Sequence, residues 1–212
     1  AADPNYQAPD ENIKNGLAKG DDGNYYYYIN NEVQWDYTGL IANSAGNWYI
    51  LNGQAQLSYD GLVTFEGTKY LIKAGHVNTA FTGITKQEGV YYYFNQGVND
   101  LEFEGLVYCN GMKAYVQDGE VNFNKTGIVE DEGKLVYVKY GIGRTTFKGL
   151  ARTDDGQWIY MANGTFDETY TGVAKLNANW VYVNAGYVDS SYSGTVTVNG
   201  VNYTVKYGVV QF

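Results

Sequence analysis

Catalysis and metal binding require reactive side chains held close together, and this sequence offers few candidates. The one histidine, His76, follows Gly75, and no second histidine or cysteine stands at ligand spacing from it. We therefore expect His76 to be a surface residue in a turn and predict no metal site. The sequence also lacks a nucleophile elbow, a phosphate-binding loop, a zinc-binding helix motif and a dinucleotide fingerprint.

Paired carboxylates are the remaining route to catalysis, because glycoside cleavage uses two carboxyls about 5 to 10 Å apart. The acidic pairs of this chain are Asp21-Asp22, Glu130 with Glu132, and Asp154-Asp155. All of them fall in predicted turns, where turn formation and solubility explain them. The sequence therefore predicts no catalytic residue, no cofactor and no enzymatic activity.

Aromatic side chains are the third kind of candidate, because they stack on sugar rings or surround organic cations. The chain has 23 Tyr, 8 Phe and 4 Trp among 212 residues. Several of them stand in short alternating segments such as Trp158-Ile159-Tyr160-Met161, which predict β-strands. The candidate ligand-binding residues are Trp48, Trp158, Trp180, Tyr160, Tyr182 and Tyr91.

A 22-residue repeat must position these aromatics. A glycine, in most units followed by Leu, Ile or Val, recurs every 22 or 23 residues, at Gly16, Gly39, Gly61, Gly83, Gly105, Gly127, Gly149, Gly172 and Gly194. A second glycine follows six or seven residues later in all but one unit, and a third closes the strand in every unit but the first. Asn110-Gly111, Asp155-Gly156 and Asn199-Gly200 predict two-residue hairpin turns, because these residues tolerate positive φ.

Each unit is too short to bury its own apolar face, so neighbouring units must supply the core. We predict an all-β fold, an elongated solenoid-like stack of about nine 22-residue β-hairpin repeats over residues 15–212, with units starting near those glycines and no internal domain boundary. Val116, Val138 and Val183 are expected contacts between repeats. Residues 1–14 contain both prolines and predict an N-terminal tail or linker.

Charge and cysteine content narrow the partners and the compartment. The net charge of −9 argues against nucleic acid and anionic lipid, which an acidic surface repels. No apolar run approaches the roughly 18 residues of a membrane helix, so no membrane insertion is expected. The single cysteine, Cys109, cannot form an intramolecular disulfide and is expected to be a small buried residue.

The pattern Thr-Gly-Leu, then Gly-x-Trp-x-Tyr-Val, then Gly-x-Val-x-x-x-Tyr-Thr-Gly resembles the cell-wall-binding repeats of Gram-positive bacteria. That superfamily includes choline-binding modules, glucan-binding repeats and the repetitive oligopeptide domains of clostridial toxins. The resemblance covers Asn15 to Phe212. It implies a β-hairpin solenoid, a secreted or cell-surface location, and recognition of choline or carbohydrate between adjacent hairpins.

One departure from the family pattern bears on the ligand. Choline-binding repeats carry Trp after Thr-Gly, whereas this chain has apolar aliphatic residues there: Leu40, Leu62, Ile84, Leu106, Ile128, Leu150 and Val173. This loss removes one wall of an aromatic cage, and a quaternary ammonium needs several such walls within about 6 Å. The second family aromatic survives at Trp48, Trp158 and Trp180, and the last two, in neighbouring repeats, form the first pair to examine for a carbohydrate site.

Two functions remain open from sequence. The first is a non-catalytic secreted or surface binding module for a cell-wall polysaccharide or other glycan, with choline or a host surface protein as further partners. The second is a structural spacer within a larger surface protein. Exposure of Trp48, Trp158 and Trp180 beside a groove would favour binding, and burial of all three would favour the spacer.

Overall fold

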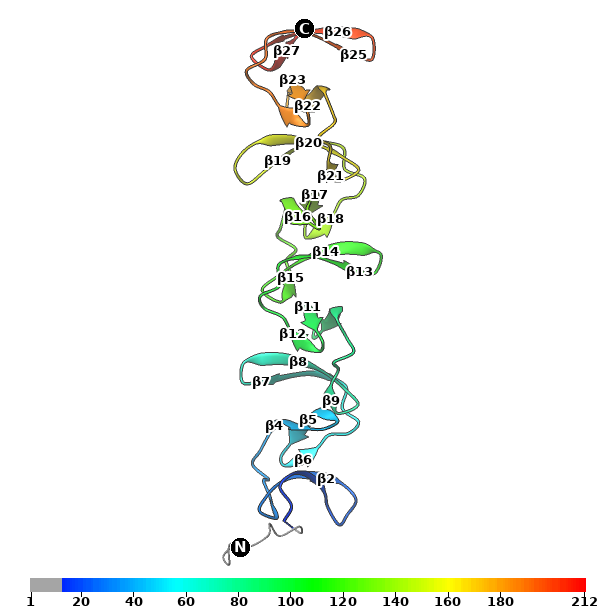
Figure 1. Cartoon of the computed structure of the whole chain (residues 1–212), viewed down its shortest axis with the longest axis vertical. Helices are drawn as coiled ribbons and strands as arrows, with labels where there is room; N and C mark the ends of the chain where they lie inside the picture. The colour runs from blue at the N-terminus through cyan, green and yellow to red at the C-terminus, as the bar shows by residue number, and fades with distance from the viewer. Residues whose placement is uncertain (1–12) are drawn as a thin grey trace, which may run out of the picture. The chain divides into compact units, whose positions relative to one another are not determined.

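The computed structural model describes residues 13–212, and residues 1–12 of the predicted tail lie outside them. The described residues form 27 antiparallel strands and no helix (Figure 1). No helix long and apolar enough to cross a membrane occurs in this part of the chain. The predicted all-β fold of repeated hairpins is confirmed.

Each of the nine repeats has two long strands, which form a hairpin, and one short strand after it. The first long strands are β1(Gly16–Lys19), β4(Gly39–Asn43), β7(Gly61–Phe65), β10(Gly83–Gln87), β13(Gly105–Cys109), β16(Gly127–Asp131), β19(Gly149–Arg152), β22(Gly172–Leu176) and β25(Gly194–Val198). The second long strands are β2(Tyr25–Ile29), β5(Gly46–Leu51), β8(Thr68–Lys73), β11(Val90–Asn95), β14(Met112–Gln117), β17(Lys134–Lys139), β20(Trp158–Ala162), β23(Asn179–Asn184) and β26(Val201–Lys206). The short strands are β3(Glu32–Val33), β6(Gln54–Ala55), β9(His76–Val77), β12(Val98–Asn99), β15(Glu120–Val121), β18(Ile142–Gly143), β21(Thr165–Phe166), β24(Tyr187–Val188) and β27(Val209–Gln211).

The described residues divide into two compact units. Unit 1 holds residues 13–89 and 94–100, and unit 2 holds residues 90–93 and 101–212, so that β11 contributes to both. Within unit 2, the hairpin β19–β20 projects to one side in Figure 1, and the hairpins β13–β14 and β25–β26 project to the other. The limits 1–14 and 15–212 for tail and array stay a prediction.

One position of the second strand lies at the centre of the core in each repeat. It is the residue that pairs with the first glycine of that repeat. Gly127 pairs with Val138, for example, and Gly172 with Val183, and both valines are fully buried. Val183 of repeat 8 clusters with Tyr160 of repeat 7, which confirms that the predicted contacts join neighbouring repeats. The same position holds Ile50, Ile72, Val116 and Met161 in other repeats, all nearly inaccessible.

Backbone hydrogen bonds at the third glycine join one repeat to the next. The Tyr49 N–H of repeat 2 donates to the Gly75 carbonyl of repeat 3 (2.8 Å), and the Gly75 N–H donates to the Tyr59 carbonyl (2.9 Å). The first of these bonds recurs at 2.7 to 2.9 Å between eight successive pairs of repeats among the described residues, from Tyr27 with Gly53 to Tyr182 with Gly208. Each second strand from β2 to β23 also pairs with the short strand of the following repeat, as Trp48 does with His76.

The connector aromatic of most repeats packs on the tyrosine of the second strand. Tyr160 stacks on Tyr170 with ring centres 3.6 Å apart, and Tyr137 stacks on Phe147 at 4.0 Å. In repeat 5 a lysine takes this place, and the Lys125 Nζ lies 5.3 Å from the centre of the Tyr115 ring. A lysine ammonium over the tyrosine ring thus replaces the ring–ring contact at the one connector that lacks an aromatic residue at this position.

Two of the three predicted two-residue turns are confirmed, and one is wrong. Asn110-Gly111 has φ values of 50° and 80°, and Asn199-Gly200 has 51° and 80°. Asp155-Gly156 instead belongs to a longer loop, in which the Thr153 N–H donates to the Gln157 carbonyl (2.9 Å) and the Gly156 N–H donates to the Thr153 carbonyl (3.0 Å). The reason is one extra residue in this repeat, which moves the turn out of the two-residue geometry.

We expect Gly75→Ala to destabilise the array much more than Gly67→Ala, although both glycines have φ near 80°. A Cβ at Gly75 would meet the Gln56 carbonyl oxygen at 2.5 Å, whereas a Cβ at Gly67 meets nothing within 4 Å. Left-handed φ alone costs alanine about 1 to 2 kcal/mol, and the backbone clash adds about 1 to 3 kcal/mol. Urea unfolding of both variants measures the difference, and equal midpoints would contradict the role assigned to Gly75.

Candidate functional site

The strand register places the predicted tryptophans on different faces. Trp158 pairs with Arg152 and Trp180 with Lys175, but Trp48 pairs with Ile41, one residue closer to the first glycine. Because successive side chains of a strand alternate, Trp48 faces the opposite side of its hairpin. The prediction that all three share one position is therefore wrong, since Gly46 begins β5 in a turn that differs from the other repeats.

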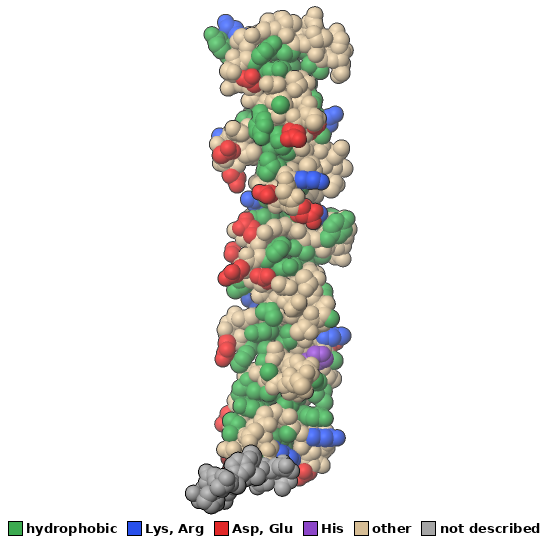
Figure 2. Space-filling view, in the orientation of Figure 1, with side chains coloured by type: hydrophobic (Ala, Val, Ile, Leu, Met, Phe, Trp, Pro, Cys, Tyr) green, Lys and Arg blue, Asp and Glu red, His purple; other side chains and the backbone are tan. Residues whose placement is uncertain are grey.

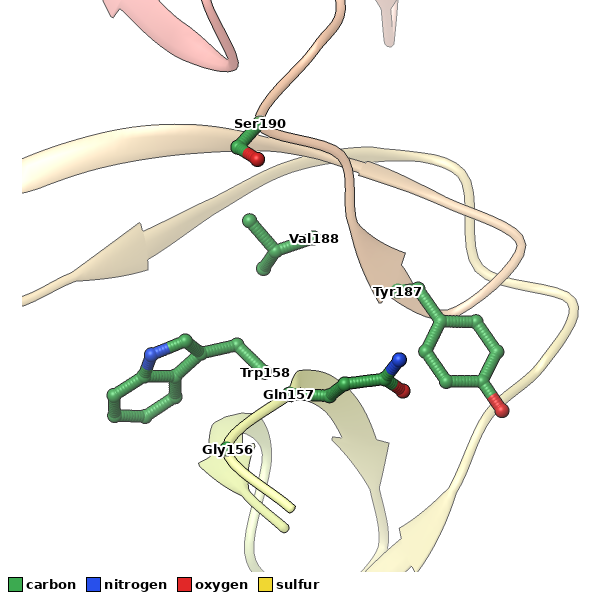
Figure 3. Close-up of a pocket in the computed structure, with 6 residues that line it drawn as sticks. All are labelled: Gly156, Gln157, Trp158, Tyr187, Val188 and Ser190. Carbon is green, nitrogen blue, oxygen red and sulfur yellow. The ribbon is translucent and has the colours of Figure 1, made fainter.

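A groove of about 570 Å³ lies beside Trp158 in unit 2. Its lining comes from the turn and second strand of repeat 7 and from the short strand and connector of repeat 8: Gly156, Gln157, Trp158, Tyr187, Val188 and Ser190. Figure 3 shows the Trp158 and Tyr187 rings pointing to opposite sides, with the Gln157 amide reaching between them. No lining residue carries a charge, and Trp180 is not among them.

A second groove, of about 270 Å³, lies in unit 1 between repeats 1 and 2. It is lined by Leu17, Tyr25, Asn43, Ala45, Trp48 and Leu57. The Trp48 Nε1 donates to the Asn43 Oδ1 (3.1 Å), and its ring centre lies 5.1 Å from that of His76. His76 is therefore half-buried under Trp48, which corrects the prediction of a surface residue.

Tyr160 and Tyr182 are packing residues in this structure. They are 6% and 8% exposed, and Tyr182 packs against Tyr192 with ring centres 4.4 Å apart. Burial also raises the pKa of Tyr182 above its usual value. A ligand would have to displace core contacts to reach either ring. These two residues are therefore not part of the proposed site.

Tyr91 lies near the start of its strand, close to the hairpin turn. An aromatic side chain of the following repeat packs against it. Its ring meets the edge of Phe123, with centres 5.8 Å apart. Phe123 stands four residues after the third glycine of its repeat, the place that Ser190 occupies in repeat 8. Phe123 at this corner therefore packs on the strand aromatic Tyr91, whereas Ser190 at the same corner lines the groove beside Trp158.

Tyr187 and Tyr25 line the two grooves but are not among the ligand-binding residues predicted from sequence. Tyr187 follows the third glycine of its repeat, and nothing in the local sequence says that it faces the turn of the repeat before. Tyr25 did have a signal, because it follows Asp-Asp-Gly and an amide residue, as Trp158 does. Residues 13–212 contain no cluster of three His, Cys, Asp or Glu side chains that could hold a metal, and Cys109 is only half-buried.

Comparison with known proteins identifies the repeat. Residues 36–55, 58–78 and 169–189 match the family model described as a choline-binding repeat. Three segments of the chain are therefore similar to choline-binding repeats. The matched segments fall on repeats 2, 3 and 8. Repeats 1 and 7, which hold Tyr25 and Trp158, are not matched by the family model. No curated protein matches the chain.

Several solved structures are similar to the chain. CbpJ from Streptococcus pneumoniae TIGR4 is 22% identical, with 93% of this chain and 58% of that chain covered and a TM-score of 0.32. Choline binding protein F from Streptococcus pneumoniae is 24% identical, with 94% and 58% covered and a TM-score of 0.31. An alternansucrase in complex with isomaltononaose is 19% identical, with 93% and 17% covered and a TM-score of 0.34. The chain thus spans 58% of the length of the first two and much less of the third.

We expect Tyr160→Ala to cost far more stability than Trp158→Ala. Tyr160 is buried against Tyr170, so truncation leaves a cavity worth about 3 to 5 kcal/mol. Trp158 stands half-buried at the edge of its groove, and its loss should cost only about 1 kcal/mol. Denaturant unfolding of the two variants provides the comparison. A larger loss for Trp158→Ala would mean that this ring is a packing residue.

Proposed function

We propose that the chain is a non-catalytic binding module of the bacterial cell surface that holds a neutral cell-wall saccharide in the Trp158 groove. The family of the repeats supports a wall-binding role. The observation that carries the proposal is the open groove in which the half-buried Trp158 offers its indole beside the Gln157 amide and Ser190 hydroxyl. An aromatic platform with a few polar groups and no charge suits a neutral pyranose ring.

The geometry favours a sugar over choline. A quaternary ammonium gains about 0.5 to 2 kcal/mol from each aromatic face, and it needs several faces around one point. Here Leu150 and Val173 stand where choline-binding repeats carry Trp, and Trp158 and Tyr187 point away from each other (Figure 3). A sugar ring needs only one aromatic face and hydrogen-bonding groups beside it, which this groove supplies.

Tryptophan exposure favours binding over a spacer role. Trp180 is 39% exposed, and Trp48 and Trp158 are half-buried at the two grooves, so none of the three is sealed in the core. A chain that only set distance would have no reason to expose them. Apolar side chains also reach the surface between polar ones on the face shown in Figure 2.

The carboxylates near the groove support a non-catalytic role. The Thr153 hydroxyl donates to Asp155, and this bond lowers the pKa of that carboxyl. Asp154 and Asp155 are both exposed on the turn, and neither lines the groove. A general acid needs the opposite setting, an apolar surrounding that keeps its proton near neutral pH.

We expect Ser190→Phe to block the Trp158 groove and weaken binding to cell walls without unfolding the chain. The new ring would stand at the corner from which Phe123 contacts Tyr91, and it would cover Trp158 in the same way. Retention on purified cell walls, together with a neutral glycan array, measures the effect, and we expect a loss of roughly 10-fold or more, equivalent to about 1.4 kcal/mol.

Thr145→Phe is the matched control, because Thr145 is exposed at the same corner of repeat 6. It should bind walls like the unchanged chain. Unaltered retention of Ser190→Phe would rule out the groove. If free choline, but not neutral sugars, releases the unchanged chain from cell walls, the site binds choline and the saccharide proposal is wrong. If the chain binds host proteins and no cell walls, its ligand is a host protein.

A further inference from the structure

Two repeats have a longer hairpin turn than the others, and both contribute to a groove. Residues 20–24 join β1 to β2 in repeat 1, and residues 153–157 join β19 to β20 in repeat 7. Both turns contain Asp-Asp-Gly, then an amide residue, then the aromatic that begins the next strand, Tyr25 or Trp158. Tyr25 lines the groove beside Trp48 in unit 1, and Trp158 lines the groove described in unit 2.

The two turns share their hydrogen bonds as well as their sequence. The Gly20 N–H donates to the Asn24 carbonyl (2.7 Å) and the Gly23 N–H to the Gly20 carbonyl (3.1 Å). Thr153, Gly156 and Gln157 form the same pair of bonds in repeat 7, at 2.9 and 3.0 Å. The second Asp of each turn accepts side-chain hydrogen bonds, from Tyr26 and Asn24 at Asp22 and from Thr153 at Asp155.

A basic side chain braces each turn from the opposite strand. Lys19 pairs across the hairpin with Tyr25, and Arg152 pairs with Trp158. The Arg152 Nε donates to the Gly156 carbonyl (3.2 Å), and a Cβ on Gly23 would lie 3.9 Å from the Lys19 Cε. The Arg152 guanidinium therefore lies along its turn glycine, and no cation–π contact joins Arg152 to Trp158 among the described residues. Trp158 lines the groove beside this turn.

A repeat with a shorter turn shows what the extra residue changes. Repeat 8 has Trp180 at the place of Trp158 and a basic residue, Lys175, opposite it, but its turn is Asn177-Ala178. Trp180 lines neither groove. In repeat 7, by contrast, Gly156 and Gln157 of the longer turn form part of the groove wall themselves. In repeat 1 the residue that lines the groove is Tyr25, which directly follows the longer turn. An aromatic at this strand position is therefore not enough without the longer turn before it.

We propose that the longer Asp-Asp-Gly turns mark the ligand-binding repeats, so that the chain has two related saccharide sites, one in each unit, and not one site per repeat. This inference rests on the proposed function. The other repeats then serve to build the stack that holds these two. Two weak sites on one chain raise its apparent affinity for a polymer that presents many copies of the ligand.

Shortening each turn tests the proposal. Deletion of Asp154 with Asp155→Asn restores the 22-residue period and gives repeat 7 the Asn-Gly turn of repeat 5, and deletion of Asp21 with Asp22→Asn does the same in repeat 1. Neutral oligosaccharides released from purified cell walls serve as the probe, and native mass spectrometry counts the molecules bound per chain. We expect two on the unchanged chain, one on each single variant and none on the double variant.

The controls separate turn length from acidity and from folding. Asp154→Ala with Asp155→Asn and no deletion keeps the turn length, and it should keep two bound molecules. Trp158→Ala and Tyr25→Ala should each remove one, which tests the sites even if a shortened turn fails to fold. Undiminished binding in the shortened and alanine variants would overturn the two-site inference while leaving wall binding intact. Absence of binding by the unchanged chain would instead refute the proposed function, and this inference with it.

Discussion

The hydrogen bond from a second strand to the third glycine of the next repeat is the interaction on which the array depends. A single hairpin of this size cannot hold its own core, so each repeat must be fixed against its neighbour. The Tyr49 N–H donates to the Gly75 carbonyl, the Gly75 φ is 79°, and a Cβ on this glycine would meet the backbone of Gln56 and Leu57. Any side chain at that glycine would separate the two repeats. The 22-residue period follows, because this contact must recur at the same place in every unit.

This repeated contact leaves other positions free to vary, and the variation creates unequal sites. The corner residue four places after the third glycine is Phe123 in one repeat and Ser190 in another. Phe123 packs on Tyr91, whereas Ser190 leaves Trp158 beside an open groove. The backbone of the stack stays the same in both cases. A constant scaffold with changeable corners lets a few repeats bind while the rest provide support.

Much of the fold followed from glycine spacing, because each glycine meets a backbone requirement that no other residue satisfies easily. The buried Val138 and Val183 followed from the alternation of the strands. The site was harder to predict. The register of Trp48 depends on how the turn before Gly46 is built, and the Asp155-Gly156 turn depends on one inserted residue. Tyr187 reaches the groove from the next repeat, and such a contact exists only once the stack is formed.

The most direct test of where the ligand binds uses the four tryptophans as reporters. Fluorine NMR of the 5-fluorotryptophan-labelled chain, titrated with neutral oligosaccharides from purified cell walls, resolves each indole separately. The structure predicts that the Trp158 and Trp48 signals shift, because both rings line grooves, and that the Trp35 and Trp180 signals stay in place. Shifts confined to Trp35 and Trp180, or shifts caused by choline alone, would contradict saccharide binding in the grooves.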